Sequence, residues 1–314
     1  MTGDRDIPLV DDGAAVPFSK GLMAQSLMAT GLAPERAYAV AAAVERRLQE
    51  RGPAALTLAD LGEVARRELG AADGEVLIRR FRQWQTLRRL ETPLIILIGG
   101  ATGVGKSTLA TQLAHRLGIN RVIGTDMVRE TMRAFFAAEL MPAIHTSSFD
   151  AARAVRVPVP RETDLSKMGF IEQTKAVSVG LEALVARAVV EGQRMVVEGV
   201  HLVPGYLDRS RWGDALVVEF VLAVRDKRRH RAHFTVREWE TGGIRPLRRY
   251  VEHFAEIRRI QKYILARAEQ CGVPVVENES LDECLNEVLG TVLQRVEEYA
   301  ARLPVAKGDA GGRG

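Results

Sequence analysis

The chain has 314 residues but only two cysteines, 5% aromatic residues and no apolar run close to the length of a membrane helix. A membrane span needs roughly 20 apolar residues, so we expect none here. Cys271 and Cys284 lie in separate segments without C-x-x-C spacing, which favours a reduced, cytoplasmic setting. The first residues also lack the basic and then apolar layout of a secretory signal. These absences predict a cytoplasmic globular protein.

One short run of residues carries most of the remaining information, Gly100-Ala-Thr-Gly-Val-Gly-Lys-Ser107. It matches G-x-x-x-x-G-K-[ST] and stands between an apolar run at 94–98 and a helix-forming stretch at 107–117, as a phosphate-binding loop requires. A chance lysine in a glycine-rich turn would not have strand, loop and helix in register. We expect a nucleoside triphosphate to be bound by Gly100, Ala101, Thr102, Gly103, Val104, Gly105, Lys106, Ser107 and Thr108.

The pattern of apolar residues divides the chain into two parts and a tail. Residues 1–90 have apolar positions at helical spacing, which predicts a small helical domain. Residues 91–304 alternate short apolar runs with helical stretches, which predicts an α/β domain with a parallel five-stranded sheet flanked by helices. The expected strands are 94–98, 122–124, 195–198, 216–223 and 273–276. The polar, glycine-rich residues 305–314 are expected to be a disordered tail.

An acidic residue follows the second expected strand. Asp126 stands at the carboxyl end of that strand, where a side chain points toward the γ-phosphate crevice of such a sheet. There it can accept the proton of an attacking hydroxyl, and Arg129 in the next helical turn can hold an anionic acceptor. In the alternative interpretation, Asp126 caps the helix and Arg129 is its surface neighbour.

A second acidic residue, Glu198, ends the third expected strand. Together with the Ser107 hydroxyl, it is predicted to hold Mg²⁺, directly or through water. A lysine at the loop complements this metal, because Lys106 can reach the β- and γ-phosphates. The neighbouring His201 is either part of the site or a hydrogen-bonded loop histidine, and the sequence leaves both open.

The net charge of +4 is concentrated in an excess of basic residues between Arg225 and Arg259. Such a segment is a solvated helix face, a nucleic-acid patch or, beside a triphosphate site, a lid that faces phosphate. The aromatic content of the whole chain is only 5%, which argues mildly against nucleic acid. From this segment we expect Arg231 and Arg237 to act in catalysis and Arg245 to bind the substrate.

The stretch between 132 and 173 is long for a connection in such a fold and has few charges in its middle. An insertion at this point would lie over the acceptor side of the crevice. His145, Ser147 and Ser148 are therefore expected to hydrogen-bond a small polar substrate. The alternative for each residue is a structural loop.

Taken together, these residues resemble the 2-phosphoglycerate kinases, and the similarity runs nearly end to end. The matching pieces are Pro17-Phe-Ser-Lys-Gly21, Gly99-Gly-Ala-Thr-Gly-Val-Gly-Lys-Ser-Thr108, Gly124-Thr-Asp-Met-Val-Arg-Glu130, Glu139-Leu-Met-Pro142, His145-Thr-Ser-Ser148 and Val197-Glu-Gly-Val-His201. The resemblance implies transfer of phosphate from ATP, with Mg²⁺, to the 3-hydroxyl of 2-phosphoglycerate. The products would be 2,3-bisphosphoglycerate and ADP.

The N-terminal part is similar to the ATP-cone, a small helical nucleotide-binding module. The similar pieces are Leu9-Val-Asp-Asp-Gly13, Pro17-Phe-Ser-Lys20, the following helical stretch and Gly31. The resemblance implies allosteric sensing of ATP or dATP. Cones usually carry a basic residue where this chain has Asp11, and an acid there repels phosphate. This departure favours a structural or dimerising role, so a homo-oligomer stays open.

Two other functions use the same motifs. A nucleic-acid or toxin-type kinase would place Asp126 beside a larger acceptor, whereas a non-catalytic switch would bind ATP and a partner protein. The low aromatic content argues against the first function. Asp126 together with an extended acceptor region favours catalysis over the second.

Overall fold

The computed structural model of the protein describes residues 8–11, 14–51, 57–240 and 247–303. The described residues form two compact units, one within 1–90 together with 290–303 and the other within 91–289. Residues 290–303 thus group with the N-terminal part rather than with the α/β domain that we expected to run to 304. The predicted tail at 305–314 lies outside the described residues.

The first unit packs four helices around an apolar core: α1 (Lys20–Met28), α2 (Pro34–Arg51), α3 (Leu58–Leu69) and α4 (Ala71–Arg89). Leu27, Val44, Leu61 and Leu77 are among the buried residues that form this core. Thr57 caps α3 and forms a capping box with Asp60, which fixes the start of that helix.

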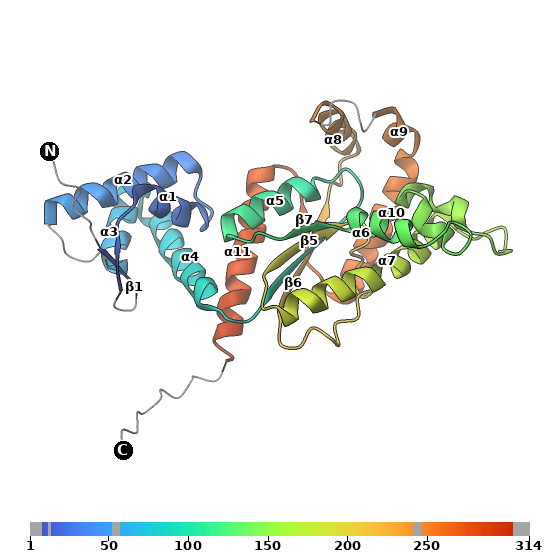
Figure 1. Cartoon of the computed structure of the whole chain (residues 1–314). Helices are drawn as coiled ribbons and strands as arrows, with labels where there is room; N and C mark the ends of the chain where they lie inside the picture. The colour runs from blue at the N-terminus through green and yellow to red at the C-terminus, as the bar shows by residue number, and fades with distance from the viewer. Residues whose placement is uncertain (1–7, 12–13, 52–56, 241–246, 304–314) are drawn as a thin grey trace, which may run out of the picture. The chain divides into compact units, whose positions relative to one another are not determined.

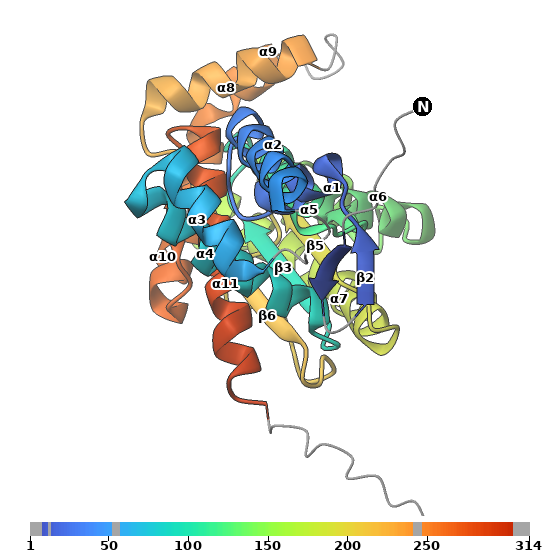
Figure 2. The same cartoon turned by 90° about the vertical axis from the view of Figure 1, so that its left-hand side faces the viewer.

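This unit is not entirely helical, contrary to the prediction. Strands β1 (Pro8–Asp11) and β2 (Ala14–Pro17) pair antiparallel, with Leu9 opposite Val16, and lie side by side in Figure 2. Backbone pairing holds these four-residue strands, and in the sequence of this part only the stretch around residues 7–10 has a strand pattern.

The second unit is the predicted α/β domain (Figure 1). Its sheet is parallel in every pairing and has the order β4-β5-β3-β6-β7. The strands are β3 (Leu94–Gly99), β4 (Val122–Gly124), β5 (Met195–Gly199), β6 (Leu216–Ala223) and β7 (Val275–Glu277). All residues of β3 are buried, because helices cover the sheet on both faces.

The helices of this unit lie in two layers around the sheet. On one side are α5 (Lys106–Leu117) and the first turns of α11 (Leu281–Ala300), and on the other are α7 (Leu165–Val190) and α10 (Phe254–Cys271) (Figure 1). Val177 and Leu181 of α7 pack against Ile95 and Leu97 of β3. Burial on both faces therefore fixes the central strand, from which the phosphate loop emerges.

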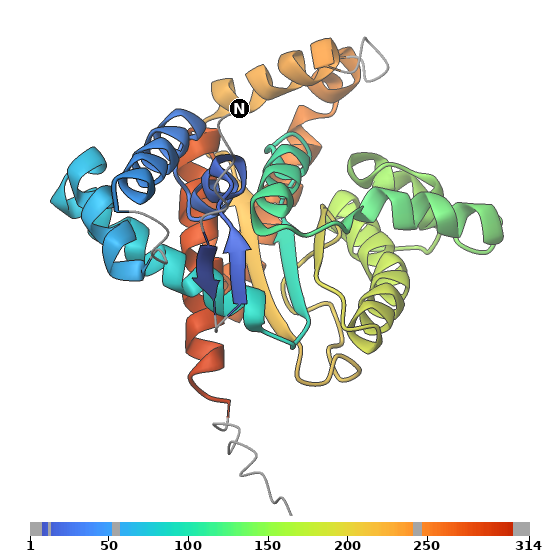
Figure 3. The same ribbon diagram turned by 60° about the vertical axis from the view of Figure 1, so that its left-hand side comes forward.

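The remaining elements lie near the carboxyl ends of the strands. Helix α6 (Thr125–Phe135) follows β4 directly, and the 3₁₀ helices η1 (Pro142–His145) and η2 (Ser148–Ala154) occupy the long connection to α7. The basic segment forms α8 (Lys227–Glu240) and α9 (Leu247–Glu252), drawn in orange beyond these strand ends in Figure 3. None of the helices in the described part of the chain is long and apolar enough to cross a membrane.

Candidate active site

The predicted phosphate loop connects β3 to α5. Gly103 and Gly105 have φ angles of 84° and 91°, a left-handed conformation that favours glycine. Gly105 is also the N-cap of α5, and no side chain hydrogen-bonds the helix start. The first amides of α5 are therefore free of a side-chain cap, which leaves them available to an anion.

The ammonium group of Lys106 lies beneath this loop. Its Nζ donates a hydrogen bond to the Ala101 carbonyl oxygen at 2.7 Å, and the residue is only 8% exposed. Burial lowers the pKa of Lys106, while the carboxylates of Glu198 and Asp126 act to raise it. Because the hydrogen-bond acceptor of Nζ is a neutral carbonyl, the ammonium can still pair with an anion at the loop.

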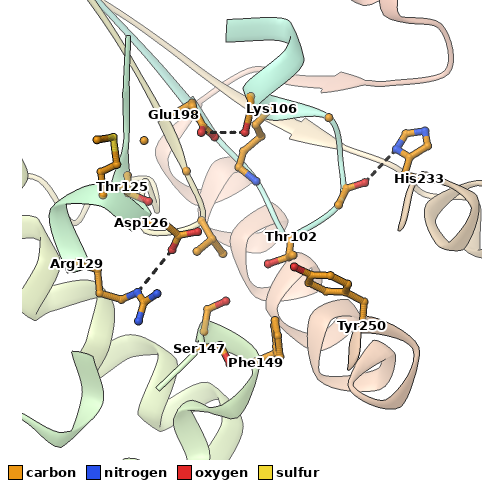
Figure 4. Close-up of a pocket in the computed structure, with 18 of the residues that line it drawn as sticks. Thr102, Lys106, Thr125, Asp126, Arg129, Ser147, Phe149, Glu198, His233 and Tyr250 are labelled. Atoms are coloured by element: carbon orange, nitrogen blue, oxygen red, sulfur yellow. Dashed lines mark hydrogen bonds and ion pairs between the residues drawn. The ribbon is translucent and has the colours of Figure 1, made fainter. Parts of the chain in front are cut away.

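Glu198 lies beside the start of α5. Its Oε1 accepts a hydrogen bond from Ser107 Oγ at 2.9 Å (Figure 4). The sheet register brings Glu198 level with Ile98 of β3 and with Gly124 of β4. Because β5 lies between β3 and β4, this carboxylate stands between the phosphate loop and the start of α6.

Asp126 is in the first turn of α6, but it does not cap that helix. The N-cap is Gly124, and no side chain hydrogen-bonds this helix start. The Asp126 side chain is 66% exposed, and its Oδ1 lies 3.6 Å from Nε of Arg129 (Figure 4). The capping alternative is therefore wrong, and the carboxylate stays accessible to a bound molecule.

A single cavity of about 1090 Å³ joins these groups. Its lining includes most residues that the sequence predicted for both sides of the reaction: Thr102, Gly103, Gly105, Lys106, Ser107, Thr108, Asp126, Arg129, His145, Ser147, Ser148 and Glu198. Gly100, Ala101 and Val104 are not part of the lining, and the last two are fully buried beneath the loop. In Figure 4, Ser147 and Phe149 lie across the cavity from Glu198.

Arg129 is predominantly engaged with the protein itself. Its Nη1 donates to the carbonyl oxygens of Ile144 and Thr146 at 3.0 and 2.9 Å, and its Nη2 to Glu130 at 2.8 Å. The side chain is 11% exposed. Arg129 therefore fastens η1 to α6, and few of its N–H groups remain for the anionic acceptor that the sequence predicted for it.

His201 is fully buried and takes part in hydrogen bonds that hold the same segment. Its Nδ1 lies 2.9 Å from the Thr125 hydroxyl and its Nε2 lies 2.9 Å from Gln173 Oε1. The Gln173 amide in turn donates to the carbonyl oxygens of Ala143 and Thr146 at 2.6 and 2.9 Å. Of the two roles left open by the sequence, the structure gives His201 that of a hydrogen-bonded histidine that helps to position the acceptor segment.

This arrangement predicts a pH dependence of stability. Burial lowers the pKa of His201 to about 4, the Asp126 carboxylate opposes this shift, and Arg129 and Lys106 add to it. Between the ordinary histidine pKa of about 6.5 and the folded-state value, the His201 ring is protonated in the unfolded state but neutral in the folded state. His201 should therefore lower the free energy of unfolding by about 2 kcal/mol between pH 7 and pH 5.

Urea unfolding of the wild type and of His201→Gln at these two pH values measures the effect. The variant is expected to have a lower free energy of unfolding at pH 7 and a smaller loss toward pH 5. The same change at the exposed His115 is the matched control. An identical pH dependence in the wild type and His201→Gln would contradict the assignment.

Helix α8 holds the phosphate loop from outside. His230 Nε2 lies 2.8 Å from the Thr102 carbonyl oxygen, and His233 Nδ1 lies 3.0 Å from that of Gly103. The ring of Phe234 covers Gly103, where a β-carbon would collide with it. Burial lowers the pKa of His230 to about 4, so its neutral ring donates to Thr102 at neutral pH.

The arginines predicted from the basic segment have different positions. Arg231 lies over the ring of Phe254, 4.6 Å from its centroid, and does not line the cavity. Its predicted catalytic role is therefore not supported by its position. Arg245 lies outside the residues that the structure describes, as does the side chain of Arg237.

Sequence reasoning missed several cavity residues, among them Arg249, Tyr250 and Asn278. Asn278 directly follows β7, and its Nδ2 donates to the Val104 carbonyl oxygen at 2.9 Å. The rule that singled out Asp126 and Glu198, a polar residue at the carboxyl end of a strand, would have found it. Nothing local in the sequence separates Arg249 from the other arginines of its segment.

The chain was also compared with known proteins. No family profile matches it. It is 39% identical over 290 residues to the 2-phosphoglycerate kinase of Methanothermobacter thermautotrophicus, which covers 91% of this chain and 94% of the relative. The 2-phosphoglycerate kinase of Thermococcus kodakarensis is 39% identical over 283 residues, covering 90% and 95%. That of Methanopyrus kandleri is 37% identical over 281 residues, covering 90% and 85%. With such identity over nine tenths of its length, the chain belongs to the 2-phosphoglycerate kinase family.

Proposed function

We propose that this protein transfers the γ-phosphoryl group of ATP to the 3-hydroxyl of 2-phosphoglycerate, giving 2,3-bisphosphoglycerate and ADP. The observation that carries the proposal is the shared cavity, which Lys106 and Asp126 both line. The family to which the chain belongs supports the choice of acceptor. Neither a nucleic-acid acceptor nor a non-catalytic switch is favoured by that membership.

On the donor side, the loop amides and Lys106 would surround the phosphates of ATP. The Lys106 ammonium can neutralise charge that develops on the transferred group, in a position that burial shields from water. Since Gly103 and Gly105 already have their left-handed conformations, little rearrangement of the loop is needed for binding.

Ser107 and Glu198 fit the requirements of Mg²⁺. Their oxygens are hard ligands that lie 2.9 Å apart, and magnesium takes only one or two protein carboxylates, with waters and substrate phosphates as its other ligands. Within the described residues, no group of three or more His, Cys, Asp or Glu side chains could hold a metal on its own. Mg²⁺ would neutralise phosphate charge at this position.

On the acceptor side, Asp126 would accept the proton of the 3-hydroxyl. That oxygen forms a bond to the γ-phosphorus while the bond from phosphorus to the bridging oxygen breaks, and ADP leaves with the electron pair. The exposure of Asp126 suits this role, because an accessible carboxylate can come within hydrogen-bond distance of the acceptor hydroxyl.

A coupled ADP-release assay tests the proposal. The acceptors are 2-phosphoglycerate, 3-phosphoglycerate, glycerate and an oligonucleotide, and phosphorus NMR identifies the product. We expect 2-phosphoglycerate to give the highest kcat/KM. Turnover stimulated only by the oligonucleotide would refute the proposal. The cytoplasmic location and a homo-oligomeric state stay predictions, the latter open to light scattering.

A further inference from the structure

The lysine and arginine side chains that line the cavity are not equally free to bind an anion. Within the described residues, these side chains are Lys106, Arg129, Arg133 and Arg249. Lys106 lies at the phosphate loop, and Arg129 is directed at protein oxygens, as described above. Arg133 Nη1 contacts both carboxylate oxygens of Glu130, at 2.9 and 2.7 Å. These three side chains are therefore committed to other groups.

Arg249 differs, because its direct hydrogen bond goes to a neutral hydroxyl rather than to a carboxylate. Its Nη2 donates to Ser147 Oγ at 3.0 Å and lies 3.8 Å from Asp150 Oδ2, while the guanidinium lies over the ring of Phe149, 5.5 Å from the centroid. The side chain is 56% exposed. No bond from its Nε or Nη1 to another described residue is present. The guanidinium is thus oriented in advance, with donors left for a ligand.

Asp150 does not cancel the positive charge at this position. Its carboxylate also accepts from Ser147 Oγ at 2.8 Å, lies 3.4 Å from His253 Nε2, and lies 3.9 Å from Nε of Arg153. One negative charge is therefore shared between two arginines and a histidine. The surroundings of Arg249 keep a net positive charge that favours an anion.

Aromatic packing fixes the position of Arg249 relative to the donor site. Phe234, which covers Gly103 of the phosphate loop, stacks on Tyr250 with ring centroids 4.9 Å apart. Tyr250 in turn makes an edge contact with Phe149 at 5.9 Å. This row of rings connects the phosphate loop to η2, so Arg249 and its partners are held on the acceptor side of the same cavity.

We propose that Arg249, positioned by Ser147, Asp150 and Phe149, binds the 2-phosphate of the acceptor and sets the preference for a phosphorylated over an unphosphorylated substrate. The inference rests on the proposed function and names a specificity residue for it. A phosphate dianion carries the largest charge of this acceptor and matches the planar donor fork of an arginine. A separate cation for it also reduces its repulsion from the γ-phosphate.

The test compares Arg249→Met with Arg248→Met, a matched change at a neighbour that is 88% exposed, pairs with Glu252 and does not line the cavity. In Arg249→Met, the KM for 2-phosphoglycerate should rise 10- to 100-fold, as expected for lost charge-assisted hydrogen bonds, while the KM for ATP changes less than about twofold. Arg249→Lys should recover part of the loss. Arg248→Met should resemble the wild type.

Two competing compounds, each lacking one charged group of the acceptor, show whether Arg249 binds its phosphate or its carboxylate. 2-Hydroxyethyl phosphate lacks the carboxylate, and glycerate lacks the phosphate. In Arg249→Met the inhibition constant of the first should rise by the same factor as the KM, and that of glycerate should change little. An unchanged KM, or an equal rise for glycerate, would overturn the role of Arg249. Absence of turnover of 2-phosphoglycerate by the wild type would instead overturn the proposed function.

Discussion

Replacement of Lys106 by alanine is expected to lower kcat by about 10³-fold or more, the range found when a cation or donor that stabilises a transferring phosphoryl group is removed. The ammonium is buried beneath the loop, close to the Ala101 carbonyl and near the carboxylates of Glu198 and Asp126. Water cannot replace such a charge efficiently, because the preorganised position is what lowers the barrier. The measurement is steady-state ADP release with 2-phosphoglycerate at saturating ATP.

The matched control for this change is Lys175→Ala, which removes an exposed lysine from α7. It should retain wild-type kinetics. Thermal unfolding of both variants distinguishes catalytic loss from unfolding, and we expect Lys106→Ala to stay folded because a buried charge is removed rather than created. A Lys106→Ala protein that is folded and retains more than a tenth of wild-type kcat would contradict the proposed donor site.

Replacement of Asp126 by asparagine is expected to lower kcat by roughly 10²- to 10⁴-fold, the usual contribution of a general base. The affinity for ATP should stay within a few-fold of wild type, because the phosphate loop and Glu198 are unchanged. Stability should also change little, since the Asp126 end of its ion pair with Arg129 is 66% exposed and water screens it, which limits the contribution to about 1 kcal/mol. Single-turnover kinetics and titration with a fluorescent ATP analogue measure the two effects separately.

Glu172→Gln neutralises an exposed carboxylate on α7 and is the control for the loss of negative charge. It should leave both measurements unchanged. If Asp126→Asn weakened ATP binding as much as it lowered kcat, Asp126 would act on the donor side instead. An unaltered kcat in Asp126→Asn would show that Asp126 has no role in the reaction.

Most of the sheet could be predicted from the sequence, because continuous apolar runs mark strands that are buried on both faces. The strands at 122–124 and 216–223 have the expected bounds. The last strand was expected at 273–276, but β7 is Val275–Glu277. The carbonyl oxygen of Pro274 still accepts a hydrogen bond from Val221 N–H at 2.9 Å, so the backbone contact with β6 begins just before the strand itself.

The residues of the candidate site could be predicted where their positions follow from a neighbouring strand or motif in the sequence. Lys106, Asp126 and Glu198 each have a place set by a strand end, and all three line the cavity. Arg249 depends instead on a contact with Ser147, 102 positions earlier in the chain. No spacing rule connects residues so far apart, so only the packing of α9 against η2 distinguishes Arg249 from Arg231.

The hydrogen bonds around His201 run in one direction only. The Thr125 hydroxyl donates to Nδ1 of the neutral ring, Nε2–H donates to Gln173, and the Gln173 amide donates onward to the carbonyls near η1. The direction is set at the end of the series, because a backbone carbonyl can only accept. The Gln173 amide must therefore donate to it, and each earlier group must donate to the next. A glutamate at position 173 has nearly the same shape as glutamine and could still accept from the His201 ring. It has no N–H groups to donate, however, and its carboxylate would repel the two carbonyl oxygens. The segment that carries Ser147 would therefore lose these hydrogen bonds.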